Sequence, residues 1–380
     1  MHPTIRVKDI RDFADLEALQ EDWNALLAST DNAVFSTWEW ITCWWKHFGQ
    51  KRQLRVLVAE EDSNVVAIAP LMLSEYRLMK IGTLRKIEFI GTPDSDVNNF
   101  LWLRRERDCL SLFLEYLVKR NDWDCLELGD VRQDSVLARH LSDLHPGPPW
   151  EWEERVASVS PYIELPNTFG ELTDQLGSVM RHNVNRRSRR LAEKHKIEVQ
   201  TSEDFGSLDK AMEVMFELHQ KRRANVSNRP STFAAPQTRD FHNDLAKQFA
   251  AKKWLALNFL TADGEPVATT YSFEYGQKTY VYQVGFDPRF SRYGVGTLLH
   301  LRNIEENIGR HLREYDFLKG DEAYKFSWPV SVRHGMELRL MKPNFLVRIH
   351  SLAEKEKRQL GKVLRRTDVR QMREKSDGDL

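Results

Sequence analysis

The stretch from Trp254 to Phe286 constrains the fold of this chain more than any other, because it alternates strand-like runs with short turns. Residues 254–260, 266–275 and 279–286 are rich in aliphatic and aromatic side chains. An Asp-Gly turn separates the first two runs, and Gly-Gln-Lys separates the last two. Runs joined by such short turns predict an antiparallel meander of adjacent strands.

A glycine-containing turn and a helix follow this meander. Residues 298–310 carry apolar side chains at helical spacing, and the run Glu-Tyr-Asp-Phe-Leu at 314–318 has the composition of a short strand. The order of three strands, a turn, a helix and a strand predicts an α/β (α+β) unit, in which a mixed, mostly antiparallel sheet is flanked by helices.

The same order occurs in weaker form near the N-terminus. Residues 54–73 parallel residues 254–273, and the run Asp-Trp-Asp-Cys-Leu-Glu-Leu-Gly-Asp at 122–130 parallels residues 314–321. An internal duplication explains both matches, although any two hairpins have some likeness. The sequence therefore predicts two related α/β domains.

The run His-Pro-Gly-Pro-Pro at 145–149 disfavours both helix and strand and marks the end of the first domain. We place the domains at 1–160 and 161–348, followed by a charged helical tail at 349–380. Asn167–Lys194 is predicted to be helical, with Asn167 or Thr168 as its cap. The tryptophans near the N-terminus are interpreted as core and domain interface rather than as a platform for sugars; they are Trp38, Trp40, Trp44 and Trp45.

Composition excludes several functional classes. Lys and Arg together number 56, as do Asp and Glu, so no basic excess indicates DNA or RNA as a partner. The sequence has neither the apolar run of a signal peptide nor that of a membrane span. Cys43, Cys109 and Cys125 are scattered, which argues against a disulfide framework and a zinc site. We expect a cytoplasmic protein with no metal and with buried cysteines.

The turn before residues 298–310 is the first candidate site. Free backbone N–H groups at a helix start bind phosphate when small residues let it approach. Gly294 and Gly296 provide this access, and Arg292 offers a cation, although two glycines at a helix start also serve as ordinary caps. The predicted donor-binding turn comprises Arg292, Tyr293, Gly294, Val295, Gly296 and Thr297.

The segment from Tyr280 to Trp328 resembles the core of the CelD/BcsL family of GNAT acetyltransferases, which is linked to cellulose and exopolysaccharide biosynthesis. The family pattern is Gly-Phe-Asp-Pro, then Tyr-x-x-Gly-x-Leu-Leu, then Asp-Phe-Leu, a basic residue, Gly, an acidic residue, two further positions and Tyr-Lys. The matching positions are Gly285 to Pro288, Tyr293, Gly296, Leu298, Leu299, Asp316 to Asp321, Tyr324 and Lys325.

The resemblance covers most of the chain up to about Lys342. It departs from the pattern at Ser291, where the general GNAT signature has Gln or Arg, and at Gly294-Val295, where the family often has Ser-Pro. It implies two tandem GNAT-like domains, of which the first is degenerate and the second is the working acyltransferase.

The resemblance also implies how the donor binds. GNAT enzymes hold acyl-CoA, here acetyl-CoA, where two parallel strands separate, and a backbone N–H on the fourth strand polarises the thioester carbonyl. On this reading Glu314–Leu318 is the separated partner strand. The N–H comes from the segment formed by Gln283, Val284 and Gly285.

Acid and base groups are expected at the end of the partner strand, because the amine loses a proton and the thiolate gains one. Asp321 or Glu322 is predicted to be the base or to hold the amine, and Tyr324 to be the acid. Asp316 is either catalytic or structural. The alternative for this cluster is a solvated helix start capped by Asp321. His219 either has a functional role, in which it contacts the acceptor or serves as a base, or is an ordinary polar residue of a helix.

A basic segment is the last candidate. Arg186, Arg187 and Arg190 crowd one predicted helix, and guanidinium groups suit phosphate or carboxylate. Together with Lys325 they are predicted to bind an acceptor, which is a small molecule or a polysaccharide precursor and carries negative charge on this reading. A solvated basic face is the alternative.

These observations predict transfer of an acyl group, most simply acetyl, from CoA to an amine on a sugar or sugar-like acceptor in exopolysaccharide or cell-envelope biosynthesis. Peripheral association with a polysaccharide synthesis complex would follow from that role. Two alternatives stay open. One is a Fem-type transferase that uses aminoacyl-tRNA, and the other is a non-catalytic GNAT-like assembly factor.

Overall fold

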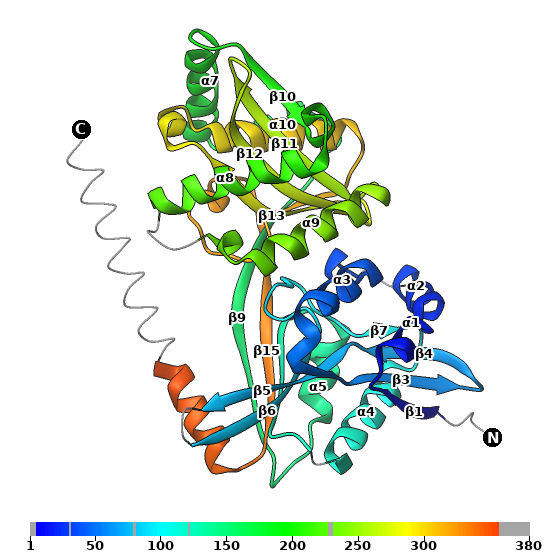
Figure 1. Cartoon of the computed structure of the whole chain (residues 1–380). Coiled ribbons are helices and arrows are strands. Elements are labelled where there is room, and N and C mark those ends of the chain that lie inside the picture. Colours follow the sequence, from blue (N-terminus) through cyan, green and yellow to red (C-terminus); the bar gives the residue numbers. More distant parts are fainter. Residues whose placement is uncertain (1–4, 30–31, 79–80, 121, 227–230, 357–380) are drawn as a thin grey trace.

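The computed structural model describes residues 5–29, 32–78, 81–120, 122–226 and 231–356. Two α/β units lie one above the other in Figure 1, and two long strands run between them. The mixed α/β architecture with mostly antiparallel strands confirms the predicted fold class.

The first unit contains eight strands and five α-helices among the described residues. In chain order they are β1 (Ile5–Ile10), α1 (Phe13–Glu17), α2 (Gln20–Ala28), α3 (Trp38–Phe48), β2 (Arg52–Leu54), β3 (Val56–Glu61), β4 (Asn64–Ala69), β5 (Leu71–Leu78), β6 (Gly82–Phe89), β7 (Leu101–Trp102), α4 (Glu106–Arg120), β8 (Cys125–Arg132) and α5 (Val136–Leu144).

The second unit follows with β9 (Glu151–Glu164), α6 (Phe169–Gln175), α7 (Ser178–Ala192), β10 (Ile197–Thr201), α8 (Leu208–Val226), α9 (Pro236–Ala251), β11 (Leu255–Ala262), β12 (Glu265–Tyr275), β13 (Lys278–Phe286), the 3-10 helix η5 (Pro288–Tyr293), α10 (Val295–Gly309), β14 (Glu314–Asp316) and β15 (Ser331–Met341). The helix predicted over Asn167–Lys194 is two helices, because the chain leaves helical geometry at Leu176. Thr168 caps the first of them through its side chain.

The strands β9 and β15 join the two units into one sheet. The eleven-stranded sheet has the order β10-β11-β12-β13-β14-β9-β15-β8-β6-β5-β2. β15 pairs with β9 along its whole length and with β8 of the first unit from Gly335 to Met341. The last strand among the described residues therefore adds to the sheet of the first unit. The domain boundary proposed at residue 160 falls within β9, which contributes to both units.

The two predicted hairpins form and are alike in detail. β3 and β4 are joined by Asp62-Ser63, and β11 and β12 by Asp263-Gly264. In both hairpins the register shifts shortly before the turn, between Ala59 and Glu60 in the first and between Leu260 and Thr261 in the second. A shared irregularity at the same place in two hairpins supports the internal duplication, because β-bulges are retained within families.

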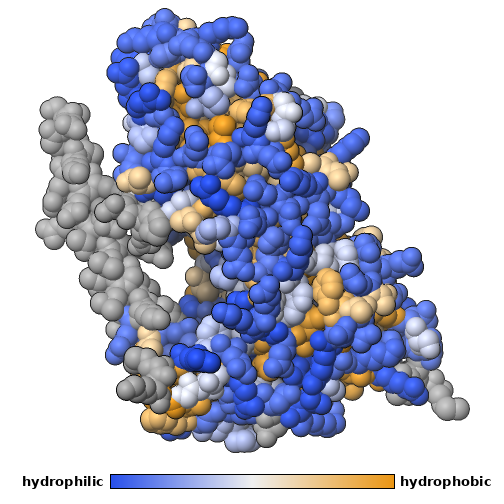
Figure 2. Space-filling model, viewed as in Figure 1, coloured by the Kyte–Doolittle hydropathy of each residue, from blue (hydrophilic) through white to orange (hydrophobic). Residues whose placement is uncertain are grey.

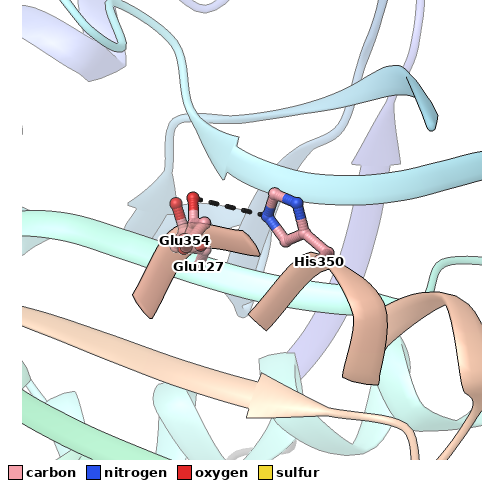
Figure 3. A group of neighbouring side chains, drawn as sticks. All are labelled: Glu127, His350 and Glu354. Carbon is pink, nitrogen blue, oxygen red and sulfur yellow. Dashed lines mark ion pairs between the residues drawn. The ribbon is translucent and has the colours of Figure 1, made fainter. Parts of the chain in front are cut away.

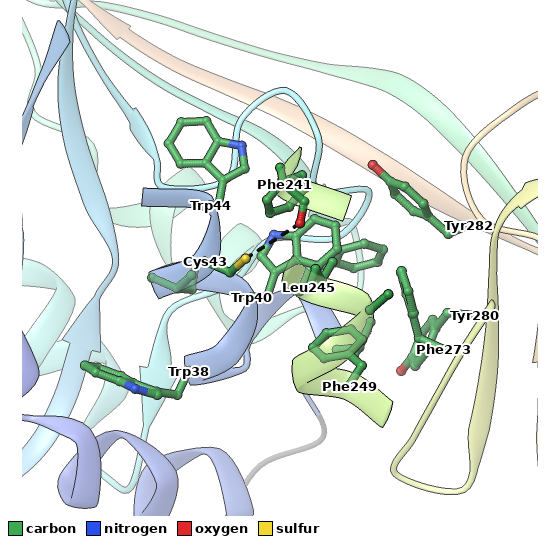
Figure 4. Packing of buried hydrophobic residues seen from close by; sticks show 14 of the residues in the cluster. Trp38, Trp40, Cys43, Trp44, Phe241, Leu245, Phe249, Phe273, Tyr280 and Tyr282 are labelled. Atoms are coloured by element: carbon green, nitrogen blue, oxygen red, sulfur yellow. Dashed lines mark hydrogen bonds between the residues drawn. The ribbon is translucent and has the colours of Figure 1, made fainter. Parts of the chain in front are cut away.

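Aromatic side chains of α3 fill the interface between the units (Figure 4). Trp40 is fully buried, and its ring centroid lies 5.6 Å from that of Phe241 and 6.0 Å from that of Phe273, both in the second unit. Its indole N–H donates to Ser95 Oγ over 2.8 Å. Burial of such large rings is strongly favourable, so the interface is a continuous core. The prediction for these tryptophans is confirmed, as is burial of the three cysteines.

Hydrophilic residues cover most of the face seen in Figure 2. Within the described ranges, no helix has both the length and the apolar character needed to cross a bilayer. A further helix spans residues 345–356. The rest of the predicted tail lies outside the described residues.

Candidate active site

A fork between β13 and β14 is the centre of the site. These parallel strands pair over three residue pairs only, and the last is Tyr280 with Asp316. The register of β12 and β13 shifts by one residue at Tyr282, and such a bulge bends a strand. Beyond Tyr280, β13 has no strand partner on its β14 side within the described chain. The strands therefore separate at the segment from Gln283 to Gly285. This is the segment predicted from the sequence to provide the N–H that binds the thioester.

Helix α8 crosses β13 at the fork. A Cβ at Gly285 would lie 2.5 Å from the backbone nitrogen of His219, so only glycine permits this approach. The buried His219 ring has Nε2 3.1 Å from Gln283 Oε1 and Nδ1 2.8 Å from Ser231 Oγ. Burial, reinforced by the charge of Arg222, lowers the pKa of His219 to about 4. A neutral ring with both nitrogens occupied orients Gln283 more readily than it accepts a proton.

Tyr324 lies against α10. Its ring stacks on His300 at 5.9 Å between centroids, and His300 Nδ1 is 2.8 Å from the hydroxyl of Tyr315. Burial raises the pKa of the Tyr324 phenol above its usual range, with nearby Glu322 adding to the effect and Arg222 opposing it. The phenol therefore stays protonated at neutral pH, which is the state that a proton donor requires.

Sequence reasoning missed His300. It is one of three buried polar residues of α10, and Asn303 and Asn307 hydrogen-bond to Thr270 and Thr279 of the underlying sheet. Their spacing of three and four residues is a helical period, and this polar stripe was a signal available in the sequence.

The remaining acidic candidates differ in their surroundings. Asp321 and Glu322 are exposed. Lys325 is buried, and its ammonium group donates to the carbonyl oxygens of Leu318 and Lys319 and pairs with Glu322 at 3.0 Å. These contacts hold the loop together, so Lys325 is positioned to shape the site rather than to reach a ligand.

Asp316 faces a cavity between the two units. The cavity has a volume of about 300 Å³, and its walls include Asp96 and Asp130 from the first unit and Asp316 and Arg333 from the second. Burial, together with Glu314, raises the pKa of Asp316 to about 6, and burial raises that of Asp96 to about 6. Asp316 also accepts the backbone N–H of Leu318 over 2.7 Å. The carboxyl group is thus held rigidly at the mouth of the fork.

The glycine turn has the form expected of an anion site. Gly294 adopts a left-handed conformation with φ of 62° and caps α10 without a side-chain hydrogen bond. The first turn of α10 carries no acidic residue. Arg292 is exposed and folds back on Tyr293, donating to its hydroxyl over 2.9 Å.

The basic helix α7 lies beside this turn. Arg187 lies beside Gly294, with its Nη1 atom 2.9 Å from the position that a Cβ at residue 294 would occupy. Arg190 is exposed, and Arg186 donates to Asn183 of its own helix over 3.0 Å. The structure therefore brings together Arg187 and the glycine turn. It does not bring the three arginines together around one pocket.

Glu127, His350 and Glu354 have ligand atoms within 4.8 Å of one another (Figure 3). Glu127 already pairs with Lys86 at 2.9 Å and with Arg339 at 3.0 Å, and Arg339 also pairs with Glu354. Both cations on Glu127 repel a metal ion, so this group is an ion-pair network that links β6, β8, β15 and the helix at residues 345–356.

The meander, the fork and the glycine turn define an acyltransferase of the GNAT class. Residues 178–326 match the family described as the acetyltransferase (GNAT) domain, so the second unit carries that domain. No curated protein matches the sequence.

Most of the chain is similar in fold to several solved structures. FemX superposes with a TM-score of 0.61 at 11% identity, over 87% of this chain and 96% of FemX. A conserved protein of unknown function from Bacteroides thetaiotaomicron VPI-5482 gives 0.54 at 13% identity, over 89% of this chain and all 100% of that one. The C-terminal domain of a candidate lysylphosphatidylglycerol synthetase from Agrobacterium fabrum gives 0.51 at 10%, over 90% and 96%. At these identities the likeness concerns the fold alone.

Proposed function

We propose that this protein transfers an acetyl group from acetyl-CoA to a primary amine of a sugar-like acceptor. The observation that carries the proposal is the fork between β13 and β14. From the fork, β13 leads through η5 to the glycine turn of α10, and the last residue pair before the fork, Tyr280 and Asp316, lines the cavity between the units. Donor and acceptor would then meet at the fork from different directions.

The proposed reaction forms a C–N bond and breaks a C–S bond. The amine attacks the thioester carbonyl, whose oxygen is stabilised by a backbone N–H of the segment from Gln283 to Gly285. The amine proton leaves to a base, for which Asp316 is the best-placed carboxylate by its burial and its raised pKa. The departing thiolate of CoA takes a proton from Tyr324, whose phenol is kept protonated by burial.

The cavity supports an acceptor with an amino group and hydroxyl groups. Carboxylates from both units line it, and Asn98 and Asn99 add amide groups that both donate and accept hydrogen bonds. An ammonium group would be attracted by the carboxylates before it loses its proton. We extend the resemblance to the CelD/BcsL family to a role in exopolysaccharide or cell-envelope biosynthesis, in the cytoplasm.

A panel of acceptors tests this proposal. The purified protein is incubated with acetyl-CoA and glucosamine, galactosamine, nucleotide-linked amino sugars or a non-sugar polyamine, and CoA release and acceptor mass are measured. Acetylation of an amino sugar well above that of the polyamine is the expected result. Aminoacyl transfer from charged tRNA without acetyl transfer would replace the proposal by the Fem-type alternative, and no transfer with any donor would favour an assembly factor.

A further inference from the structure

Arg187 of α7 lies directly over the turn that begins α10. Its Nη1 atom is 2.9 Å, and its Cδ atom 3.2 Å, from the position that a Cβ of residue 294 would occupy. Val184 and Leu191, three and four residues away on the same helical face, are buried. They pack in one cluster with Tyr293 and Leu298. The helix is thus anchored on the body of the domain, and the Arg187 guanidinium group is held at the turn.

Other cations near the turn are already paired. Arg292 donates to Tyr293 and lies over its ring at 4.7 Å. Arg289 pairs with buried Asp287 at 2.9 Å, and Lys221 lies 3.7 Å from the same carboxylate. Arg187, by contrast, makes neither a hydrogen bond nor an ion pair with any residue of the described ranges. A half-buried guanidinium group with no partner among the described residues is available to bind an anion, and its charge-assisted hydrogen bonds to phosphate are strong.

The surroundings of Gly296, in the first turn of α10, are open. A Cβ at Gly296 would meet no atom within 4 Å, so no neighbour requires glycine there. Glycine inside a helix costs about 1 kcal/mol relative to alanine. An open surface next to unpaired N–H groups of a first helical turn is the environment that a phosphate group occupies.

We propose that Arg187 binds the diphosphate of the CoA donor, together with the backbone N–H groups at the start of α10. This inference rests on the proposed function and assigns Arg187 to the donor, whereas the sequence suggested the acceptor. The general GNAT signature has Gln or Arg at the position of Ser291, and Arg187 would take the place of that side chain. A guanidinium group can bridge two phosphate oxygens. Arg190, on the exposed side of α7, has no part in donor binding.

Calorimetry with donor fragments tests the assignment in the full chain. Arg187→Gln is expected to weaken CoA binding about 10- to 100-fold, the usual range for loss of charge-assisted hydrogen bonds. The same loss is expected with dephospho-CoA, which keeps the diphosphate. Pantetheine, which has no phosphate, should bind the variant and the parent equally. Arg190→Gln is the matched control and should bind all three ligands like the parent. Glutamine preserves helix propensity, and thermal unfolding verifies that both variants fold.

The results separate this inference from the proposed function. Equal CoA affinity in Arg187→Gln and the parent overturns the role of Arg187 and leaves the function intact. A loss with CoA that disappears with dephospho-CoA assigns Arg187 to the 3′-phosphate and overturns the diphosphate contact. A loss shared by pantetheine identifies a structural effect and also overturns it. A parent protein that binds no CoA overturns the inference and the acetyl-CoA proposal together.

Discussion

At the scale of single residues, burial sets the protonation of the groups around the fork. The phenol of Tyr324 and the ring of His300 are both held in their neutral forms, and Asp316 has its pKa raised to about 6. Several groups with shifted pKa values therefore lie within one site. Such a grouping is typical of sites of acid–base catalysis.

Replacement of Tyr324 by Phe should lower kcat by roughly 10²-fold or more, because the ring still packs on His300 while the proton donor is lost. Affinity for acetyl-CoA should change little. Steady-state kinetics with calorimetry would separate the two effects. Tyr76→Phe is the control, since that hydroxyl bonds Glu88 in the first unit and should not affect turnover. Kinetics like those of the parent would assign the proton to water or to another group.

Three buried histidines predict acid sensitivity of the fold; His219 has its pKa lowered to about 4, and the other two are shifted further. Burial lowers the pKa of His242 and of His300 to about 3, against about 6.5 in an unfolded chain. As the pH falls from about 6.5 toward 3, the unfolded state binds protons that the folded state does not, so stability is lost across this window. Asp96 and Asp316 act in the opposite sense between about 6 and 4, because their folded pKa values are raised.

Urea unfolding at pH 7 and pH 5 measures this effect. The histidine contribution is isolated by His242→Phe, because His242 lies among the rings of Phe233, Phe241 and Tyr271 and a phenyl group suits that space. The variant should lose less stability than the parent between the two pH values. An identical loss would show that His242 is not neutral in the folded protein or that other groups dominate.

At the scale of elements, the start of α10 is a feature that distinguishes the second unit from the first. It follows β13 through η5 and the left-handed Gly294, and its first turn is free of carboxylates. The corresponding helix of the first unit, α4, has Glu106 and Asp108 in its first turn. Negative charge at a helix start is favourable to the helix but repels a phosphate group.

Gly296→Val is therefore expected to weaken CoA binding at least tenfold, because a branched side chain would fill the open space that the phosphates need. The free energy of unfolding should change little, since a Cβ at this position would meet no atom within 4 Å. Gly309→Val at the other end of α10 is the matched control, because a Cβ there also meets nothing within 4 Å. A fall in stability without a change in CoA affinity would make Gly296 a purely structural residue.

At the scale of the whole molecule, the two units share one sheet and one aromatic interface. β15 links them through β8 and β9, and Trp40 packs on α9 and β12 of the second unit. The cavity faced by Asp316 takes its walls from both units. The first unit is thus a wall of the candidate acceptor site, although it lacks the glycine turn of the second.

The comparison of α4 with α10 predicts one donor site in each chain. Titration of the protein with CoA should give a stoichiometry of one, and Gly296→Val should abolish or weaken that single binding event. A second binding event of similar affinity, unaffected by the variant, would place a donor site in the first unit.

The sequence alone determined the parts of the fold that depend on neighbouring residues. The strands of the meander, the glycine turn and α10 follow from alternating or helical spacing between short turns, and these patterns act over a few residues. The duplication was visible because the hairpins keep their turns at equivalent places. Tyr324 and Gly285 were found as site candidates through a family pattern that is equally local.

The tertiary structure alone decided which distant segments meet. β15 pairs with β8 and β9, which are distant from it in the sequence. Arg187 lies beside Gly294, and the ammonium group of Lys325 donates to the carbonyl oxygen of Leu318 in the preceding loop. Nothing in the local sequence of these segments specifies their partners, because long-range pairing depends on the entropy of loop closure and on packing of the whole core. For that reason the basic helix was recognised in the sequence, whereas its position beside the glycine turn of α10 required the fold.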